Sequence, residues 1–243
     1  MKFVNPLLLL IVLGGCAAQP QQTPETQITV AETAHYLPRQ SYDEKGVKIP
    51  YVPQENPYLA QTGTVSKGSV LLFIEARRAL NAGDEKTAIQ KLKVISDQDN
   101  SLAGPLVLLG DISMKHDRYA EAGDYYQQAI GVNTANINAY LGLGEAQRRL
   151  GKFTLAQNTY EQALQQWADF PEAHLNLAVL YDLYLNMPEK AQAHYEAYLF
   201  LTHNKSHVAN QWYQEVQGRT GITTSFIDPG APAKPVNKTV AAE

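Results

Sequence analysis

The stretch INAYLGLGEAQRRLGKFTLAQNTYEQALQQWADF, residues 137–170, decides the architecture because its pattern recurs along the chain. Its Ala156 stands 34 residues after Ala122, which stands 34 after Ala88 (156 − 122 = 34; 122 − 88 = 34), and Ala191 follows after 35 (191 − 156 = 35). A small residue stands 12 positions before each of the first three alanines (88 − 76 = 12; 122 − 110 = 12; 156 − 144 = 12) and 13 before the fourth (191 − 178 = 13), and a large apolar residue follows each alanine four positions later. In chain order these residues are Ala76, Gly110, Gly144 and Ala178, then Leu92, Tyr126, Tyr160 and Tyr195. Helices of a hairpin approach closely only at small residues, and bulky neighbours fill the remaining space. The recurrence therefore predicts helical hairpins stacked in series.

The pattern resembles the tetratricopeptide repeat consensus. Within residues 137–170 the matching positions are Tyr140, Leu143, Gly144, Ala156, Tyr160 and Ala163. The resemblance implies an all-α fold, an α-solenoid of about four helix-turn-helix repeats over 68–204. We expect the repeats at 69–102, 103–136, 137–170 and 171–204. A generic helical bundle would give amphipathic stretches without this shared register.

Helix boundary signals agree with the repeats. Ser66 or Ser69 can cap a first helix, and Asp84 can cap the second. Gly151 is suited to the end of a helix, and Pro188 to a first turn, where its missing N–H costs nothing. Beyond the array, apolar residues at helical spacing predict a capping helix over 205–219. These residues are Val208, Trp212, Tyr213 and Val216.

The N-terminus has the pattern of an export signal. Lys2 is followed by an apolar run over 7–13 and then by Leu13-Gly14-Gly15-Cys16, which predicts a signal peptide over 1–15. This ending resembles the lipobox of bacterial lipoproteins, which implies that Cys16 carries a diacylglycerol. Cys16 is the only cysteine of the chain, so it has no disulfide partner. An unmodified leader cysteine is the alternative. With Ala17 in the next position, the resemblance implies an outer-membrane anchor facing the periplasm.

Both flanks of the array are expected to be disordered. Residues 16–67 are rich in Gln, Thr and Pro and lack apolar periodicity, which predicts a tether, and residues 220–243 read as a tail. Two segments of the tether, 49–53 and 57–59, are more apolar than the rest. They are either an inert, partly extended linker, or they pack along the repeat groove or bind a partner.

Residues for chemistry are sparse. The formal net charge is −4 and no basic run occurs, so nucleic acid is not an expected partner. The pair Gly142 and Gly144 lacks the third glycine of a dinucleotide fingerprint. His203 and His207 flank a turn without a third ligand, and His174 occupies a packing position of its repeat. We therefore expect no enzyme activity, no cofactor and no metal.

The expected binding site is a surface. In tetratricopeptide arrays the first helix of each repeat lines the concave face, and the resemblance carries this role to ten positions. They are Phe73, Arg77, Val107, Asp111, Leu141, Glu145, Arg148, Leu175, Val179 and Asp182. An apolar row flanked by mixed charges favours an apolar peptide, extended or helical, as the partner. Family members that bind C-terminal carboxylates use lysine and asparagine at these positions, and none of the ten positions here is a lysine or an asparagine. The alternative is that part of the row belongs to the core.

A lipobox followed by tetratricopeptide repeats resembles type IV pilus pilotins and the repeat lipoproteins of Flp-type pili. The resemblance implies a membrane-anchored scaffold for an envelope complex, with pilus or secretion machinery first. An accessory regulator of a cell-wall or polysaccharide enzyme, a component of a TonB-type system, and an enzyme without a recognisable site are the alternatives. The sequence sets neither the individual partner nor the oligomeric state.

Overall fold

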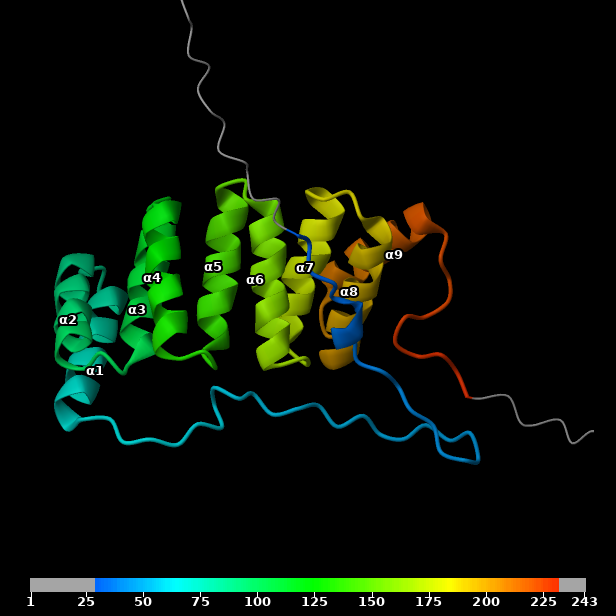
Figure 1. Cartoon of the computed structure of the whole chain (residues 1–243), viewed down its shortest axis with the longest axis horizontal. Helices are drawn as coiled ribbons and strands as arrows, with labels where there is room; N and C mark the ends of the chain where they lie inside the picture. The colour runs from blue at the N-terminus through cyan, green and yellow to red at the C-terminus, as the bar shows by residue number, and fades with distance from the viewer. Residues whose placement is uncertain (1–28, 232–243) are drawn as a thin grey trace, which may run out of the picture.

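The computed structural model describes residues 29–231, and these residues form an elongated row of helices (Figure 1). Cys16, the predicted signal peptide and residues 232–243 lie outside them. In the described part there are nine α-helices and one 3-10 helix. They are η1 (Ala34–Tyr36), α1 (Lys67–Asn81), α2 (Glu85–Gln98), α3 (Ala103–Lys115), α4 (Tyr119–Val132), α5 (Ile137–Arg149), α6 (Phe153–Gln166), α7 (Pro171–Leu183), α8 (Pro188–Leu201) and α9 (His207–Thr220).

The helices pair as consecutive hairpins, α1 with α2, α3 with α4, α5 with α6 and α7 with α8, and α9 packs on α8. Figure 1 shows the hairpins side by side in chain order. This arrangement confirms the predicted α-solenoid with a helix at its C-terminal end. No helix of residues 29–231 has the length and apolar character needed to cross a bilayer.

Small residues let the two helices of each hairpin touch, as the sequence predicts. The four repeat alanines Ala88, Ala122, Ala156 and Ala191 have no exposed surface. A Cβ added to Gly110 would stand 2.6 Å from the ring of Tyr126, and Gly144 faces the ring of Tyr160 just as closely. Because the aromatic rings lie directly against these glycines, any larger residue there would push the helices apart.

The turn inside each hairpin needs one residue with a left-handed backbone. That residue is Gly83 (φ 80°), Asp117 (φ 57°), Gly151 (φ 73°) and Asn186 (φ 51°) in the four repeats. Glycine, asparagine and aspartate are the residues that tolerate this conformation best. The predicted caps are also confirmed. Ser66 Oγ accepts from the Ser69 amide at 3.0 Å, and Asp84 Oδ1 from the Thr87 amide at 3.1 Å.

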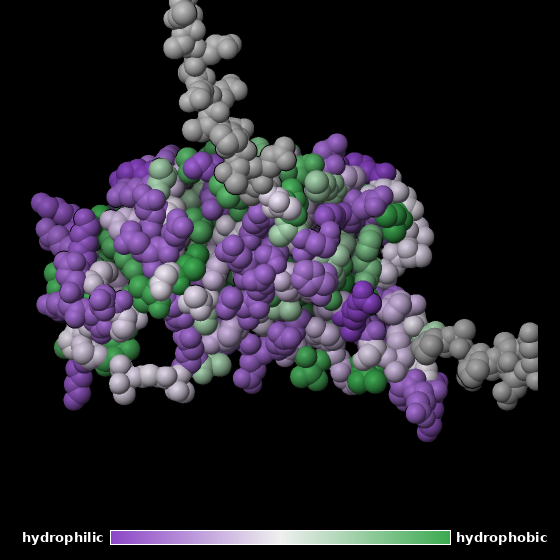
Figure 2. Space-filling model, viewed as in Figure 1, coloured by the Kyte–Doolittle hydropathy of each residue, from purple (hydrophilic) through white to green (hydrophobic). Residues whose placement is uncertain are grey.

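The apolar core is continuous in one half of the array and divided in the other. Repeats three and four with α9 share one buried cluster, which runs from Ile137 to Val216. Repeats one and two, together with residues of α5, contain three smaller clusters. On the face shown in Figure 2, hydrophilic residues predominate and hydrophobic ones form small separate groups. The core therefore lies between the hairpins.

Residues 29–66, which we call the strap, lie along the array and have no regular secondary structure except η1. Figure 1 shows their second half running beneath one edge of the row of helices. There Asp169 accepts from Tyr51 Oη at 2.6 Å and from the Gln54 amide at 2.7 Å. The Trp167 indole N–H donates to the Gln54 carbonyl at 2.9 Å. The described part of the predicted tether, residues 29–66, thus packs on the repeats, an alternative that its apolar segments left open.

The first part of the strap enters the array between α6, α7 and α8. Thr33, which is 1% exposed, places its hydroxyl 3.0 Å from Tyr181 Oη and 2.8 Å from His194 Nε2. Beyond α9, residues 222–231 of the predicted tail pack nearby, where the Gln40 amide donates to the Ile227 carbonyl at 2.9 Å. These contacts join the strap to the last repeat and to the segment that follows α9.

Candidate functional site

A cavity of about 690 Å³ lies on the side of the array formed by the first helices of the repeats. Six of the ten predicted groove residues line it: Phe73, Arg77, Val107, Asp111, Leu141 and Glu145. The lining also includes Gly104 of α3, Asn138 of α5, Glu172 and Asn176 of α7, and Tyr58 of the strap. We call this cavity the groove.

The repeat register explains why these side chains face one cavity. Arg77, Asp111 and Glu145 are spaced by 34 residues (111 − 77 = 34; 145 − 111 = 34), so each occupies the same position of its own repeat. Stacked repeats place equivalent positions side by side. The groove is therefore a row of equivalent positions from α1, α3 and α5.

The apolar row serves the groove and the core together. Val107 and Leu141 line the cavity and also pack, half-buried, against core clusters. Leu175 and Val179 pack against the large cluster but do not line the cavity. The row thus divides between groove and core.

The two remaining predicted residues make contacts within the array. Arg148 donates to Tyr184 Oη at 3.1 Å and stands 3.5 Å from Glu145, and Asp182 is paired with Arg219 of α9. Arg148 and Asp182 therefore position α7 and α9 and do not line the groove.

The groove carries more negative than positive charge. Its described lining contains the cation Arg77 and the carboxylates Asp111, Glu145 and Glu172. Asp111 accepts from Tyr126 Oη at 2.7 Å. Desolvation in the hollow raises the pKa of Asp111, and the nearby charge of Glu145 raises it further, while the Tyr126 hydrogen bond opposes the rise. A cation bound here would favour the charged carboxylate of Asp111 and offset both the desolvation and the repulsion from Glu145.

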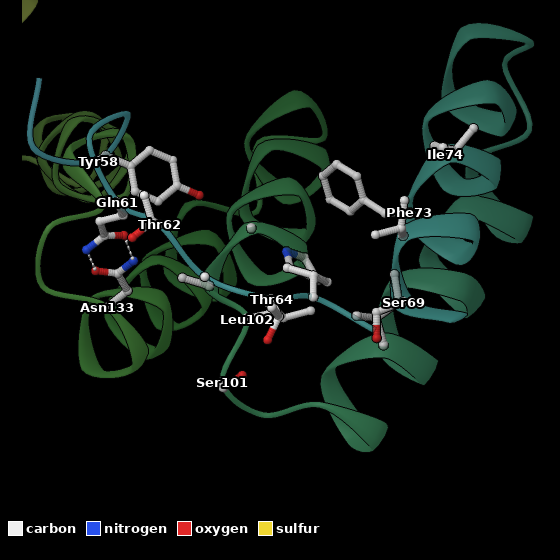
Figure 3. Close-up of a pocket in the computed structure, with 17 residues that line it drawn as sticks. Tyr58, Gln61, Thr62, Thr64, Ser69, Phe73, Ile74, Ser101, Leu102 and Asn133 are labelled. Carbon is white, nitrogen blue, oxygen red and sulfur yellow. Dashed lines mark hydrogen bonds between the residues drawn. The ribbon is translucent and has the colours of Figure 1, made fainter. Parts of the chain in front are cut away.

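A second cavity of about 700 Å³ adjoins the groove and shares Tyr58, Phe73 and Gly104 with it. Figure 3 shows Tyr58 of the strap and Phe73 of α1 on two sides of it. Residues 61–65 of the strap close another side, and Gln61 and Asn133 join their amide groups there at 2.7 and 3.2 Å. We call it the strap pocket. The sequence analysis missed it, although the apolar segment 57–59 was a signal.

The described residues hold no group of three or more His, Cys, Asp or Glu arranged for a metal ion. His174 is fully buried, as its packing position predicts. Its Nε2 bonds to the Ala168 carbonyl at 2.9 Å, and its Nδ1 lies 2.8 Å from His194 Nδ1. Burial lowers the pKa of His174 to about 4 and that of His194 well below its usual value, so both rings are neutral at pH 7.

Comparison with known proteins agrees with the repeat fold. Models of the tetratricopeptide repeat match residues 103–136 and 141–201. Among solved structures, MamA from Desulfovibrio magneticus RS-1 is similar, with a TM-score of 0.56 and 16% identity over 65% of this chain and 88% of that one. A tetratricopeptide repeat protein from Parabacteroides merdae ATCC 43184 has a TM-score of 0.56 and 21% identity, over 64% of this chain and 61% of that one. No curated protein matches the chain. The chain thus carries tetratricopeptide repeats, a scaffold type for protein–protein interaction, in the fold that these structures share.

Proposed function

We propose that this protein is a lipid-anchored scaffold that holds a protein partner in the groove and assists the assembly of a bacterial envelope complex. One observation carries the binding role. Equivalent positions of α1, α3 and α5 line a cavity of about 690 Å³ with half-buried apolar side chains beside charged ones. Apolar surface with a few polar groups around it is typical of a ligand site.

The anchor in this proposal is a lipid on Cys16, which holds the protein at the outer membrane, facing the periplasm. The lipobox resemblance of residues 13–16 supports it. The same resemblance, together with the repeats, supports a place in pilus or secretion machinery. The two parts are separable because the groove and Cys16 lie in different parts of the chain.

Photo-crosslinking tests the groove. A photoreactive amino acid replaces Asn138 or Glu172, which line the groove, or Val94 of α2, which does not and is 39% exposed. We expect the groove positions to crosslink to one shared partner in the source bacterium, and Val94 to give no such product. A partner crosslinked from Val94 and from neither groove position would contradict the proposal. The partner's identity then distinguishes pilus or secretion machinery from a cell-wall enzyme or a TonB-type system.

Metabolic labelling with an alkyne fatty acid tests the anchor. The wild-type chain should take up the label and sediment with outer membranes, whereas Cys16→Ser should do neither. Label on the serine variant, or membrane binding that survives it, would overturn the lipid anchor but leave the groove untouched.

A further inference from the structure

The two cavities that meet at Tyr58 and Phe73 have different chemistry. None of the side chains that line the strap pocket, all within the described residues, is charged. Several of its apolar side chains are also open to solvent: Val65 is 45% exposed, Val70 43% and Ile74 41%. Exposed apolar groups in a hollow without charges favour an apolar occupant, because their burial removes them from water without stranding a charge.

The groove beside it favours the opposite kind of group. One cation against three carboxylates leaves a net charge of −2 (1 − 3 = −2) along its described lining. Glu172 lies in the first turn of α7, where its side chain is exposed, and Glu145 is 42% exposed beside Arg148 and Arg149. These carboxylates lie on the α5 and α7 side, whereas Arg77 lies on α1, next to the strap pocket. Among the side chains that line the groove, the carboxylates therefore lie farther from the strap pocket than the cation Arg77 does, and Arg148 and Arg149 partly balance Glu145.

We propose that the groove and the strap pocket together bind a peptide with an apolar end and a basic segment. The apolar side chains enter the strap pocket between Ile74 and residues 61–65, and the basic ones lie over Asp111, Glu145 and Glu172. This inference rests on the proposed groove function and adds the chemical class of its ligand. Charge complementarity and the continuity of the two cavities carry it.

The two cavities meet at a narrow point, where a single added methyl group would already touch side chains on the other side. Gly104 lies at this point, and a Cβ placed on it would meet the Phe73 ring at 3.8 Å and Tyr58 Oη at 4.0 Å, which are ordinary contact distances. Gly104→Ala therefore leaves the fold intact while it narrows the passage. A ligand that occupies both cavities should be sensitive to this single methyl group.

The strap is a working part of this site. It supplies Tyr58 to both cavities and residues 61–65 to one, and the paired amides of Gln61 and Asn133 tie it to the loop between α4 and α5. Since the repeats alone would leave this pocket without one of its sides, the binding class of the array depends on a segment outside the repeats.

Fluorescence anisotropy with a labelled probe peptide tests the inference on the full chain. The probe has three leucines at one end and three lysines at the other, and it is made in both directions. Comparison probes replace the lysines with glutamates or the leucines with serines. We expect the leucine–lysine probe to bind at least about tenfold more tightly than either comparison probe.

Matched variants locate the binding. Ile74→Asp puts a charge into the strap pocket, while Leu71→Asp changes a neighbouring residue of α1 that is 61% exposed and does not line the pocket. Ile74→Asp should weaken binding about tenfold or more and Leu71→Asp should leave it unchanged. Glu172→Lys should weaken the lysine probe and strengthen the glutamate probe. Equal binding of the lysine and glutamate probes, or equal effects of Ile74→Asp and Leu71→Asp, would overturn the inference.

A library of random peptides separates this inference from the proposed function. Selected peptides that compete for the groove and share an apolar end with a basic segment support both. Selected peptides that are acidic, or uncharged throughout, overturn the ligand class while the groove function stands. If no peptide and no crosslinked partner binds the groove, both proposals fail.

Discussion

The two halves of the array differ in how their interiors are built. Repeats three and four share one continuous apolar cluster with α9, and the buried first part of the strap packs on them. Repeats one and two have smaller, separate clusters, and α1 keeps Val70, Leu71 and Ile74 exposed. The strap pocket and much of the groove lie in this second region.

The continuous core lies at one end of this repetitive fold, whereas the strap pocket and the larger share of the groove lining lie at the other. Contacts that fill space completely leave no room for a ligand, whereas a loosely filled end leaves cavities. In an array where each repeat contacts only its neighbours, one end can be rigid while the other is open. A destabilising substitution in the half with the continuous core should therefore affect more helices than one in the other half.

The largest expected effect is the loss of a buried leucine. Leu177 and Leu92 both have no exposed surface, but Leu177 lies in the continuous cluster and Leu92 in a small one. Leu177→Ala should lower the free energy of unfolding by about 2–5 kcal/mol and reduce amide protection from α5 to α9. Leu92→Ala should reduce protection in α1 and α2 and leave α7 to α9 unchanged. Hydrogen exchange measures both, and an equal spread in the two variants would break the comparison.

The pH dependence of stability should come from the half with the continuous core, where His174 and His194 are buried. Burial holds the pKa of His174 at about 4, below the 6.5 of an exposed histidine, with Asp169 opposing the shift. Burial also lowers the pKa of His194, and the nearby His174 and Lys190 lower it further. Below pH 6.5 the unfolded chain binds protons that the folded chain does not. Stability is thus full above pH 6.5 and falls as pH drops toward 4, by roughly 3 kcal/mol for His174.

Urea titration of the free energy of unfolding between pH 7 and pH 4 measures this loss. His174→Gln removes one of the two buried histidines. It should reduce the change in the free energy of unfolding per pH unit, whatever its effect on stability at pH 7. Hydrogen exchange should show earlier loss of protection in α7, α8 and residues 31–36 than in α1 and α2. A slope that His174→Gln leaves unchanged would contradict the assignment.

Glycine-to-alanine substitutions in α5 and α4 should change stability by less, and in opposite directions, because the two glycines face different neighbours. Gly144 of α5 lies against the buried ring of Tyr160, while a Cβ on Gly123 of α4 would meet Leu143 at an ordinary 3.7 Å. Gly144→Ala should cost about 1–3 kcal/mol because Tyr160 has no space to move into. Gly123→Ala should stabilise by about 0.5–1 kcal/mol, since it only removes backbone freedom. Chemical denaturation checks both, and a stabilising Gly144→Ala would show that repeat three is less tightly packed than we describe.

The sequence predicts the part of this structure that repeats. Spacing of Ala122 and Ala156 gives the hairpins, and the resemblance to tetratricopeptide repeats, counted in the same register, gives Val107 and Asp111 as groove residues. Contacts that occur once have no such signal. Thr33 reaches His194 across 161 residues, and nothing in a proline-rich segment announces that contact. Residues 61–65 of the strap pocket have no such signal either, because they belong to no repeat; the apolar segment 57–59 beside them indicated only that the strap could pack on the array.

The smallest expected effect compares one turn position in the two halves. Gly151 and Asp117 occupy equivalent left-handed turns, at φ 73° and 57°. Gly151→Ala should cost about 1–2 kcal/mol, since a Cβ crowds the carbonyl in this conformation. Asp117→Gly should change stability by less than about 1 kcal/mol. Glycine relieves the backbone, but the unfolded chain gains freedom and the hydrogen bond from Tyr119 Oη to Asp117 is lost. Thermal denaturation measures both variants. A gain in stability from Asp117→Gly that exceeds the loss from Gly151→Ala would contradict this expectation. It would show that the Asp117 turn of repeat two is strained.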